Sequence, residues 1–105
     1  MPGDLSDQPL VTRSIPIHDL GDAGLELASP LQVEVEVYAE EIVARIPELD
    51  LWASSATESE ALLQIKHEVC LLWEDLAQEE ETRLGKLPLG WKRILCRKIK
   101  IHVPA

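Results

Sequence analysis

Hydrophobic and polar residues alternate most regularly between residues 31 and 38. An extended chain with this alternation places its side chains on two opposite faces: Leu31, Val33, Val35 and Val37 on one, and Gln32, Glu34, Glu36 and Tyr38 on the other. A short connection at residues 39–41 leads into a second alternation over residues 42–46. Pro47 then interrupts the pattern before a third short segment at residues 51–55. The pattern predicts three antiparallel strands joined by tight connections.

Two shorter extended segments precede this hairpin. An apolar alternation from residue 14 contains Pro16, which indicates an edge strand or an extended arm because proline cannot donate to a sheet ladder. A second extended piece is expected over residues 25–27, before Pro30. Residues 1–13 show little periodicity, and we expect them to form a flexible N-terminus.

A long amphipathic helix is predicted after the strands. Thr57 and Glu60 have the spacing of a capping box, in which the threonine hydroxyl accepts from the Glu60 backbone N–H and the glutamate carboxylate reaches back. Apolar residues then recur at three- and four-residue steps: Leu62, Ile65, Val69, Leu72, Trp73 and Leu76. This stripe predicts a helix over residues 57–79 that covers one face of the sheet. Leu71 falls on the opposite side of that helix, where we expect it to be exposed.

The last part of the chain has a second helical pattern. Glycine and proline mark a connection at residues 85–90, and apolar residues then recur with helical spacing: Trp91, Ile94, Leu95 and Ile99. The pattern predicts a basic amphipathic helix over residues 89–100. A competing prediction takes Ile99, Ile101 and Val103 as a final strand, and both hold if the helix ends near Arg97.

These elements predict an α+β fold: a small antiparallel sheet, with a β-β-β-α core, covered by one long helix and followed by a short C-terminal basic helix. One domain over residues 14–105 suits a chain of 105 residues. Ten apolar residues are expected in its core: Val33, Val35, Val37, Val43, Ile46, Leu62, Ile65, Val69, Leu72 and Leu76.

Charge is strongly segregated along the chain. The first 81 residues hold all 19 acidic residues and three of the ten basic ones, a formal charge of −16, and residues 82–105 carry the other seven basic residues. Opposite charges of this size point to docking within the chain, docking on a neighbouring subunit, or binding to two different partners. The apolar residues of the tail favour a docked helix over a free basic arm.

Composition disfavours several classes of protein. No apolar run approaches the roughly 20 residues that cross a membrane, and the start of the chain lacks the features of a secretory signal. We therefore expect a cytoplasmic protein that does not bind membranes. Cys70, Cys96 and the three histidines lack the clustered spacing of a zinc site. We expect buried or half-buried free thiols, with neither a metal nor another cofactor.

Three segments of the chain resemble the core of HicB-like antitoxins. They are Val33-Glu34-Val35-Glu36-Val37-Tyr38, Val43-Ala44-Arg45-Ile46-Pro47-Glu48-Leu49 and Thr57-Glu58-Ser59-Glu60-Ala61-Leu62. Within the predicted core of residues 31–79, the resemblance runs from Val33 to about Leu76. Full HicB antitoxins often add a C-terminal DNA-binding domain, but the 24 residues after Glu81 are too few for a separate helix-turn-helix domain. The chain therefore resembles a stand-alone form of the core.

The resemblance implies a partial ribonuclease-H-like fold and a non-enzymatic antitoxin that binds and blocks a small basic RNA-cleaving toxin. Acidic sheet residues and the basic tail are the expected partner contacts: Glu34, Glu36, Arg45, Trp52, Trp91, Lys92 and Arg93. We also expect a homo-oligomer, with a dimer favoured. The strand over residues 31–38 is expected to mediate pairing, with pairing across a dimer as one option.

Two other functions remain open from the sequence. The basic helix could contact nucleic-acid phosphates, although a chain of net charge −9 opposes binding to a polyanion. Glu34 and Glu36 share one face of a strand as in a metal-dependent nuclease, but the sequence places no third acid or nearby histidine with them. We therefore expect no catalytic residues.

Overall fold

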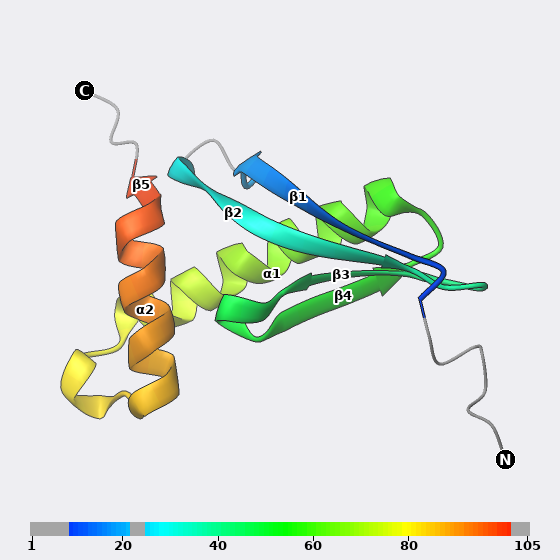
Figure 1. The fold of residues 1–105 in the computed structure, drawn as a ribbon. Helices are drawn as coiled ribbons and strands as arrows, with labels where there is room; N and C mark the ends of the chain where they lie inside the picture. The colour runs from blue at the N-terminus through cyan, green and yellow to red at the C-terminus, as the bar shows by residue number, and fades with distance from the viewer. Residues whose placement is uncertain (1–8, 22–24, 102–105) are drawn as a thin grey trace, which may run out of the picture.

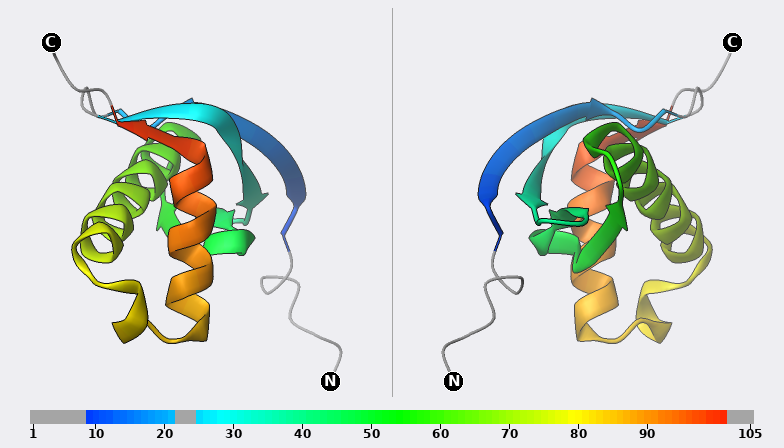
Figure 2. Two further views of the ribbon diagram at one scale, coloured as in Figure 1. Left: turned by 90° about the vertical axis from the view of Figure 1, so that its left-hand side faces the viewer. Right: turned by 90° about the vertical axis from the view of Figure 1, so that its right-hand side faces the viewer.

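The computed structural model describes residues 9–21 and 25–101 of the chain. Within these residues the elements follow the order β1 (Val11–Asp19), β2 (Leu25–Val37), β3 (Ile42–Ile46), β4 (Leu51–Ser55), α1 (Glu58–Gln78), α2 (Lys86–Lys98) and β5 (Ile99–Ile101). Two 3-10 turns, η2 (Pro47–Leu49) and η3 (Glu81–Arg83), join β3 to β4 and α1 to α2. The sheet curves, and both α-helices lie against the same side of it (Figures 1 and 2). The predicted α+β class is confirmed.

β2 is the central strand of the sheet. It pairs with β1 from Leu31 to Val37 and with β3 from Glu34 to Val37, in the strand order β1-β2-β3-β4. β5 pairs with β2 at residues 25–27. The strand over residues 31–38 mediates pairing as predicted, and it does so within the chain, with β1 along Leu31–Val37 and with β3 along Glu34–Val37. Over residues 34–37 both of its edges are therefore occupied, and that part of the strand is closed to a second copy. The outer edges of the sheet belong to β1 and β4.

β1 is an edge strand, as Pro16 predicted, but it begins earlier than expected. Residues 11–13 were assigned to the flexible N-terminus, yet they pair with residues 35–37 of β2. The alternation of apolar and polar residues is not visible there, because the charged Arg13 occupies a position on the helix side of the sheet, opposite Val35. Arg13 forms an ion pair with Glu58 of α1. The expectation for residues 1–8 lies outside the described residues.

β2 is one strand of 13 residues, not the two segments predicted on either side of Pro30. The register between β1 and β2 shifts between Ile17 and Asp19, and Pro30 lies opposite this irregularity. Its missing N–H therefore removes no bond from the regular ladder. The Pro30 carbonyl accepts a hydrogen bond from Lys98 Nζ at 3.0 Å.

The β2–β3–β4 arrangement confirms the strongest sequence pattern. The Tyr38 N–H donates to the Glu41 carbonyl at 2.8 Å, which closes the predicted connection at residues 39–41. β3 and β4 have the predicted bounds. Pro47 begins η2, and Asp50 ends it with a left-handed φ of 53°. That conformation suits a short polar side chain and turns the chain back into β4.

The start of α1 confirms half of the predicted capping box. Thr57 Oγ1 accepts a hydrogen bond from the Glu60 N–H at 3.2 Å. The Glu60 carboxylate does not follow the prediction, because it accepts the Ser55 hydroxyl at 2.7 Å. The first interaction caps α1, and the second connects the end of β4 to the first turn of the helix. The predicted helix limits, 57 and 79, are the N-cap and C-cap residues.

The core fills the space between the sheet and the two helices. Six of the ten predicted core residues are buried: Val33, Val35, Ile46, Ile65, Val69 and Leu76. Val37, Leu62 and Leu72 are partly buried against this cluster. The assignment of Val43 is wrong, because its cross-strand neighbours Glu36 and Ser54 lie on the opposite face of the sheet. Ala44 occupies the core position on β3.

The basic tail docks on the body of its own chain, where α2 closes one end of the space beneath the sheet (Figure 2). Leu95 is fully buried, and Ile99 is 7% exposed. The helix begins at Lys86, before the predicted residue 89, because a proline three residues into a helix is tolerated in the first turn. It ends at Lys98, since Ile99 enters β5, so the competing helix and strand predictions both hold. Val103 lies outside the described residues.

Candidate functional site

One face of the sheet is open, because α1 and α2 both cover the other (Figure 2). We call it the open face. Cross-strand pairing places two rows of side chains on it: Ser14, Glu34, Arg45 and Trp52 in one row, and Thr12, Glu36, Val43 and Ser54 in the next. The two rows together carry two carboxylates, one guanidinium and five neutral side chains. The open face is therefore a mixed surface with a net acidic character.

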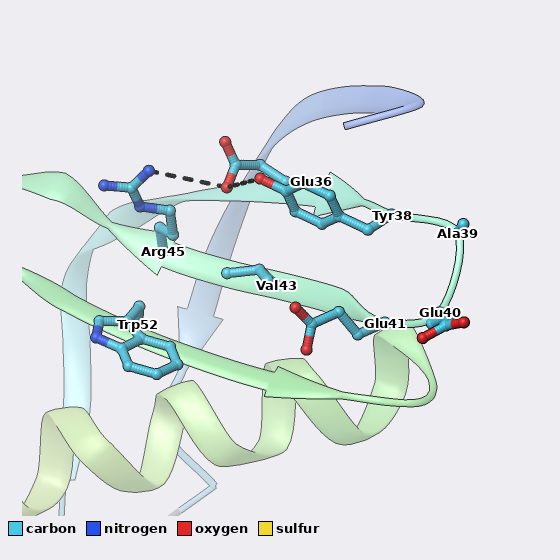
Figure 3. A pocket seen from close by; sticks show the side chains of 8 residues that line it. All are labelled: Glu36, Tyr38, Ala39, Glu40, Glu41, Val43, Arg45 and Trp52. Carbon is cyan, nitrogen blue, oxygen red and sulfur yellow. Dashed lines mark hydrogen bonds and ion pairs between the residues drawn. The ribbon is translucent and has the colours of Figure 1, made fainter. Parts of the chain in front are cut away.

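A groove of about 860 Å³ lies on the open face, next to the β2–β3 hairpin. Figure 3 shows its lining side chains, which come from the end of β2, the hairpin, β3 and β4: Glu36, Tyr38, Ala39, Glu40, Glu41, Val43, Arg45 and Trp52. The volume is within the range of small-molecule and peptide sites. Three carboxylates against one guanidinium make the groove acidic.

Glu36 is the most enclosed charged residue of the groove. Its side chain is 16% exposed, and Oε1 lies 3.8 Å from Arg45 Nη1. The same oxygen accepts the Tyr38 hydroxyl at 3.4 Å. Both contacts are longer than the roughly 2.7–2.9 Å of a strong charge-assisted hydrogen bond. Glu36 therefore keeps acceptor capacity toward the groove.

The pKa of the Tyr38 phenol is raised in this setting. Burial raises the pKa of its phenol above the ordinary value of 10.0, and the charge of Glu36 and the hydrogen bond to it raise it further. The phenol therefore stays protonated and remains a hydrogen-bond donor at neutral pH. Tyr38 holds the Glu36 carboxylate in place from the end of β2 (Figure 3).

Trp52 supplies the largest apolar surface of the groove. It lies opposite Arg45 in the β3–β4 ladder and is 66% exposed. Trp52 is one of several exposed apolar side chains of the domain, but tryptophan is the residue type most enriched at the centres of protein interfaces. Trp52 shares the groove with three carboxylates and with Arg45, so the groove offers both an apolar and an anionic surface.

The structure brings together four of the seven predicted partner residues and separates the other three. Glu34, Glu36, Arg45 and Trp52 share the open face, and all but Glu34 line the groove. The tail residues lie on α2, away from the groove: Trp91 is half-buried against the core, Lys92 Nζ donates to the Glu79 carbonyl at 2.8 Å, and Arg93 is exposed. They therefore form no common surface with the sheet residues.

The residues on the hairpin side of the groove were not predicted from the sequence. Tyr38, Glu40, Glu41 and Val43 line it but were not proposed as partner contacts. The strand alternation did place Tyr38 on the same side as Glu36, which was the available signal. The sequence of the hairpin connection does not indicate which way its side chains point, because the direction of a turn side chain depends on the local backbone conformation.

The groups that could hold a metal ion lie apart in the described residues. These residues contain no group of three or more His, Cys, Asp or Glu side chains placed to hold a metal ion. Glu34 and Glu36 do lie on one face, but Glu36 is held by Arg45 and Tyr38. Cys70 is buried as expected, whereas Cys96 is exposed, because it lies on the solvent side of α2. The described helices include none long and apolar enough to cross a membrane.

The chain matches no known family model, no curated protein and no solved structure.

Proposed function

We propose that this protein is a non-enzymatic interaction module that binds a basic protein partner on the open face of its sheet. The observation that carries the proposal is the groove, whose lining combines a 66% exposed tryptophan with three carboxylates. Strong protein contacts usually combine a central aromatic anchor, buried on binding, with a polar rim. Trp52 is the anchor in this proposal.

Charge supports a basic partner. The chain has a net charge of −9, and the groove contributes Glu36, Glu40 and Glu41 against Arg45. Complementary charge accelerates the encounter with a basic protein and disfavours acidic partners. Within the described residues, the carboxylate of Glu36 has only long hydrogen-bond contacts. A cationic side chain of the partner would therefore form its strongest hydrogen bond there.

The resemblance to the HicB-like core narrows the partner to a small basic RNA-cleaving toxin. The β2–β3–β4–α1 order agrees with the fold that this resemblance implies, which supports the proposal at the level of fold. In this function the open face covers the toxin and blocks its RNA-cleaving site. The antitoxin itself needs no catalytic group.

Co-expression with a small basic protein encoded beside this one tests the proposal. The two proteins should co-purify, and this chain should restore growth of cells that express the neighbour. Trp52→Ala should weaken binding by tenfold or more, since loss of an interface anchor typically costs about 2 kcal/mol or more. Leu63→Ala is the matched control, because Leu63 is equally exposed at 66% but lies on α1. The proposal is contradicted if the two substitutions weaken binding equally. It is also contradicted if the two proteins do not co-purify.

Nucleic-acid binding through α2 is the second candidate, and the exposure of Arg93 and Arg97 favours it. This function predicts salt-sensitive retention on RNA or DNA that Arg93→Glu/Arg97→Glu abolishes. The acidic body opposes it, because a polyanion near α2 is also near a chain of net charge −9.

A further inference from the structure

The docking of α2 leaves most of its charge uncompensated. All three basic residues of the body form ion pairs: Arg13 with Glu58, Arg45 with Glu36, and Lys66 with Asp19. Among the tail cations in the described residues, Lys98 alone forms one, at 3.9 Å from Glu48. Lys92 and Lys98 also bind backbone carbonyls of the body, so the cations of α2 that remain without such a contact are Lys86, Arg93 and Arg97.

These outward cations form one continuous basic face. Lys86, Arg93 and Arg97 are all exposed. At 100° per residue they lie within about 40° of one another around the axis of α2. Leu87, which is 67% exposed, adds an apolar side chain on the flank of these cations, about 100° from Lys86 around the axis. We call these four residues the basic face.

α1 presents a surface of the opposite kind. Leu63 is 66% exposed, and Leu71 is 42% exposed, as predicted for Leu71. The exposed carboxylates of Glu60 and Glu74 lie on the same side of the helix, within about 80° of the leucines. We call these four residues the acidic face. It turns away from the sheet, because Ile65 and the other core residues lie on the far side of the helix.

We propose that the basic face of one copy of this chain docks on the acidic face of a second copy. Opposite charges and exposed leucines match across this contact, and both faces lack a charged partner in the described part of their own chain. A polyanion fits the basic face less well, because it is repelled by the acidic body, whereas the second copy brings its acids to the contact itself. In this proposal, the separation of acidic and basic residues along the sequence supplies the two complementary faces through which copies of the chain associate.

This contact is independent of the groove. The groove lies on the open face, whereas both helices lie against the other face of the sheet (Figures 1 and 2). One molecule can therefore bind a partner and a second copy together. Each copy offers one basic and one acidic face, so two copies form a closed pair if a two-fold axis joins both contacts, and an open chain otherwise.

Sedimentation and light scattering of the purified chain at low and high salt provide the first test. Self-association should appear at low ionic strength and weaken as salt rises, because exposed charges are screened beyond a Debye length of about 8 Å at physiological ionic strength. A chain that is monomeric at low salt overturns the proposal.

A charge exchange tests the two faces directly. Arg93→Glu/Arg97→Glu places acids on both faces, and Glu60→Lys/Glu74→Lys places cations on both. Each variant alone should associate at least about tenfold more weakly than the natural chain, because like charges then meet. An equimolar mixture should recover association as a 1:1 complex, since every contact between the two variants joins opposite charges.

Glu40→Lys/Glu41→Lys is the matched control, since it makes the same charge change at the hairpin, outside both faces. This control should self-associate like the natural chain and yet bind a basic partner less well, which separates failure of this proposal from failure of the proposed function. Because all the substituted residues are exposed, each variant should keep its circular dichroism spectrum. A mixture that stays monomeric overturns the proposal. The proposal is also overturned if Arg93→Glu/Arg97→Glu abolishes retention on RNA or DNA and leaves self-association unchanged.

Discussion

Lys98 of α2 donates a hydrogen bond to the carbonyl of Pro30 in β2, with Nζ and the oxygen 3.0 Å apart. This contact joins the last turn of the C-terminal helix to the central strand, 68 residues earlier in the sequence. The lysine uses a carbonyl in the irregular part of the β1–β2 pairing. One basic residue of the tail therefore anchors the helix while its neighbours on the basic face remain exposed.

Leu95→Ala tests whether α2 is part of the fold. The Leu95 side chain is fully buried, and a leucine-to-alanine change at such a site costs about 2–5 kcal/mol of unfolding free energy. Leu87→Ala makes the same chemical change on the same helix at a side chain that is 67% exposed, and should cost less than about 0.5 kcal/mol. Urea unfolding followed by tryptophan fluorescence measures both. Equal effects would show that α2 does not pack against the body.

Thr57→Ala tests the start of α1. The substitution removes the oxygen that accepts the Glu60 N–H and should cost about 1 kcal/mol of unfolding free energy. Thr57→Ser keeps the hydroxyl and should retain most of the stability. The comparison by chemical denaturation isolates the cap, since both variants shorten the side chain. A serine variant as unstable as the alanine variant contradicts the role of the hydrogen bond.

Asp19→Asn should remove part of the pH dependence of stability in acid. A hydrogen bond from Lys66 Nζ, the charge of Lys66 and the Gly21 N–H together lower the pKa of Asp19 below its ordinary 3.8. Because the folded-state pKa is the lower one, the stabilisation is present above about pH 4 and is lost as the pH falls through the folded value. The stability difference between the natural chain and the variant should shrink toward pH 2. A difference that stays constant over that range contradicts this assignment.

Tyr38 allows a direct titration, because it is the one tyrosine of the chain. The absorbance of its phenolate should appear with a midpoint above pH 10.0, since burial and Glu36 raise the pKa of the phenol. Stability linked to this group is present below pH 10 and is lost as the pH rises through the folded pKa. Glu36→Gln should bring the midpoint back toward 10, and Glu34→Gln is the control on the same face. An unchanged midpoint in Glu36→Gln shows that Glu36 does not contact Tyr38 in solution.

The strands and helices that carry a strong local signal were predictable. The hairpin of β2 and β3, the break at Pro47 and the Thr57 cap depend on interactions within a few residues, so periodicity and turn chemistry are sufficient to locate them. Val43 shows the limit of the same reasoning. Its hydrophobicity suggested the core, but the pleat of β3 turns it toward the groove and leaves the core position to Ala44.

The sequence by itself determined the α+β class, the two amphipathic helices and the separation of charge at Glu81, because each depends on the order of residues along the chain. Only the tertiary structure decided how that charge is used. Leu95 lies in the core and Arg93 lies in solvent because the apolar side of α2 packs beneath the sheet and turns its cations outward. Likewise, Glu36 meets Tyr38 and Arg45 through the register of β2 and β3, a pairing between strands that no single segment of the sequence contains.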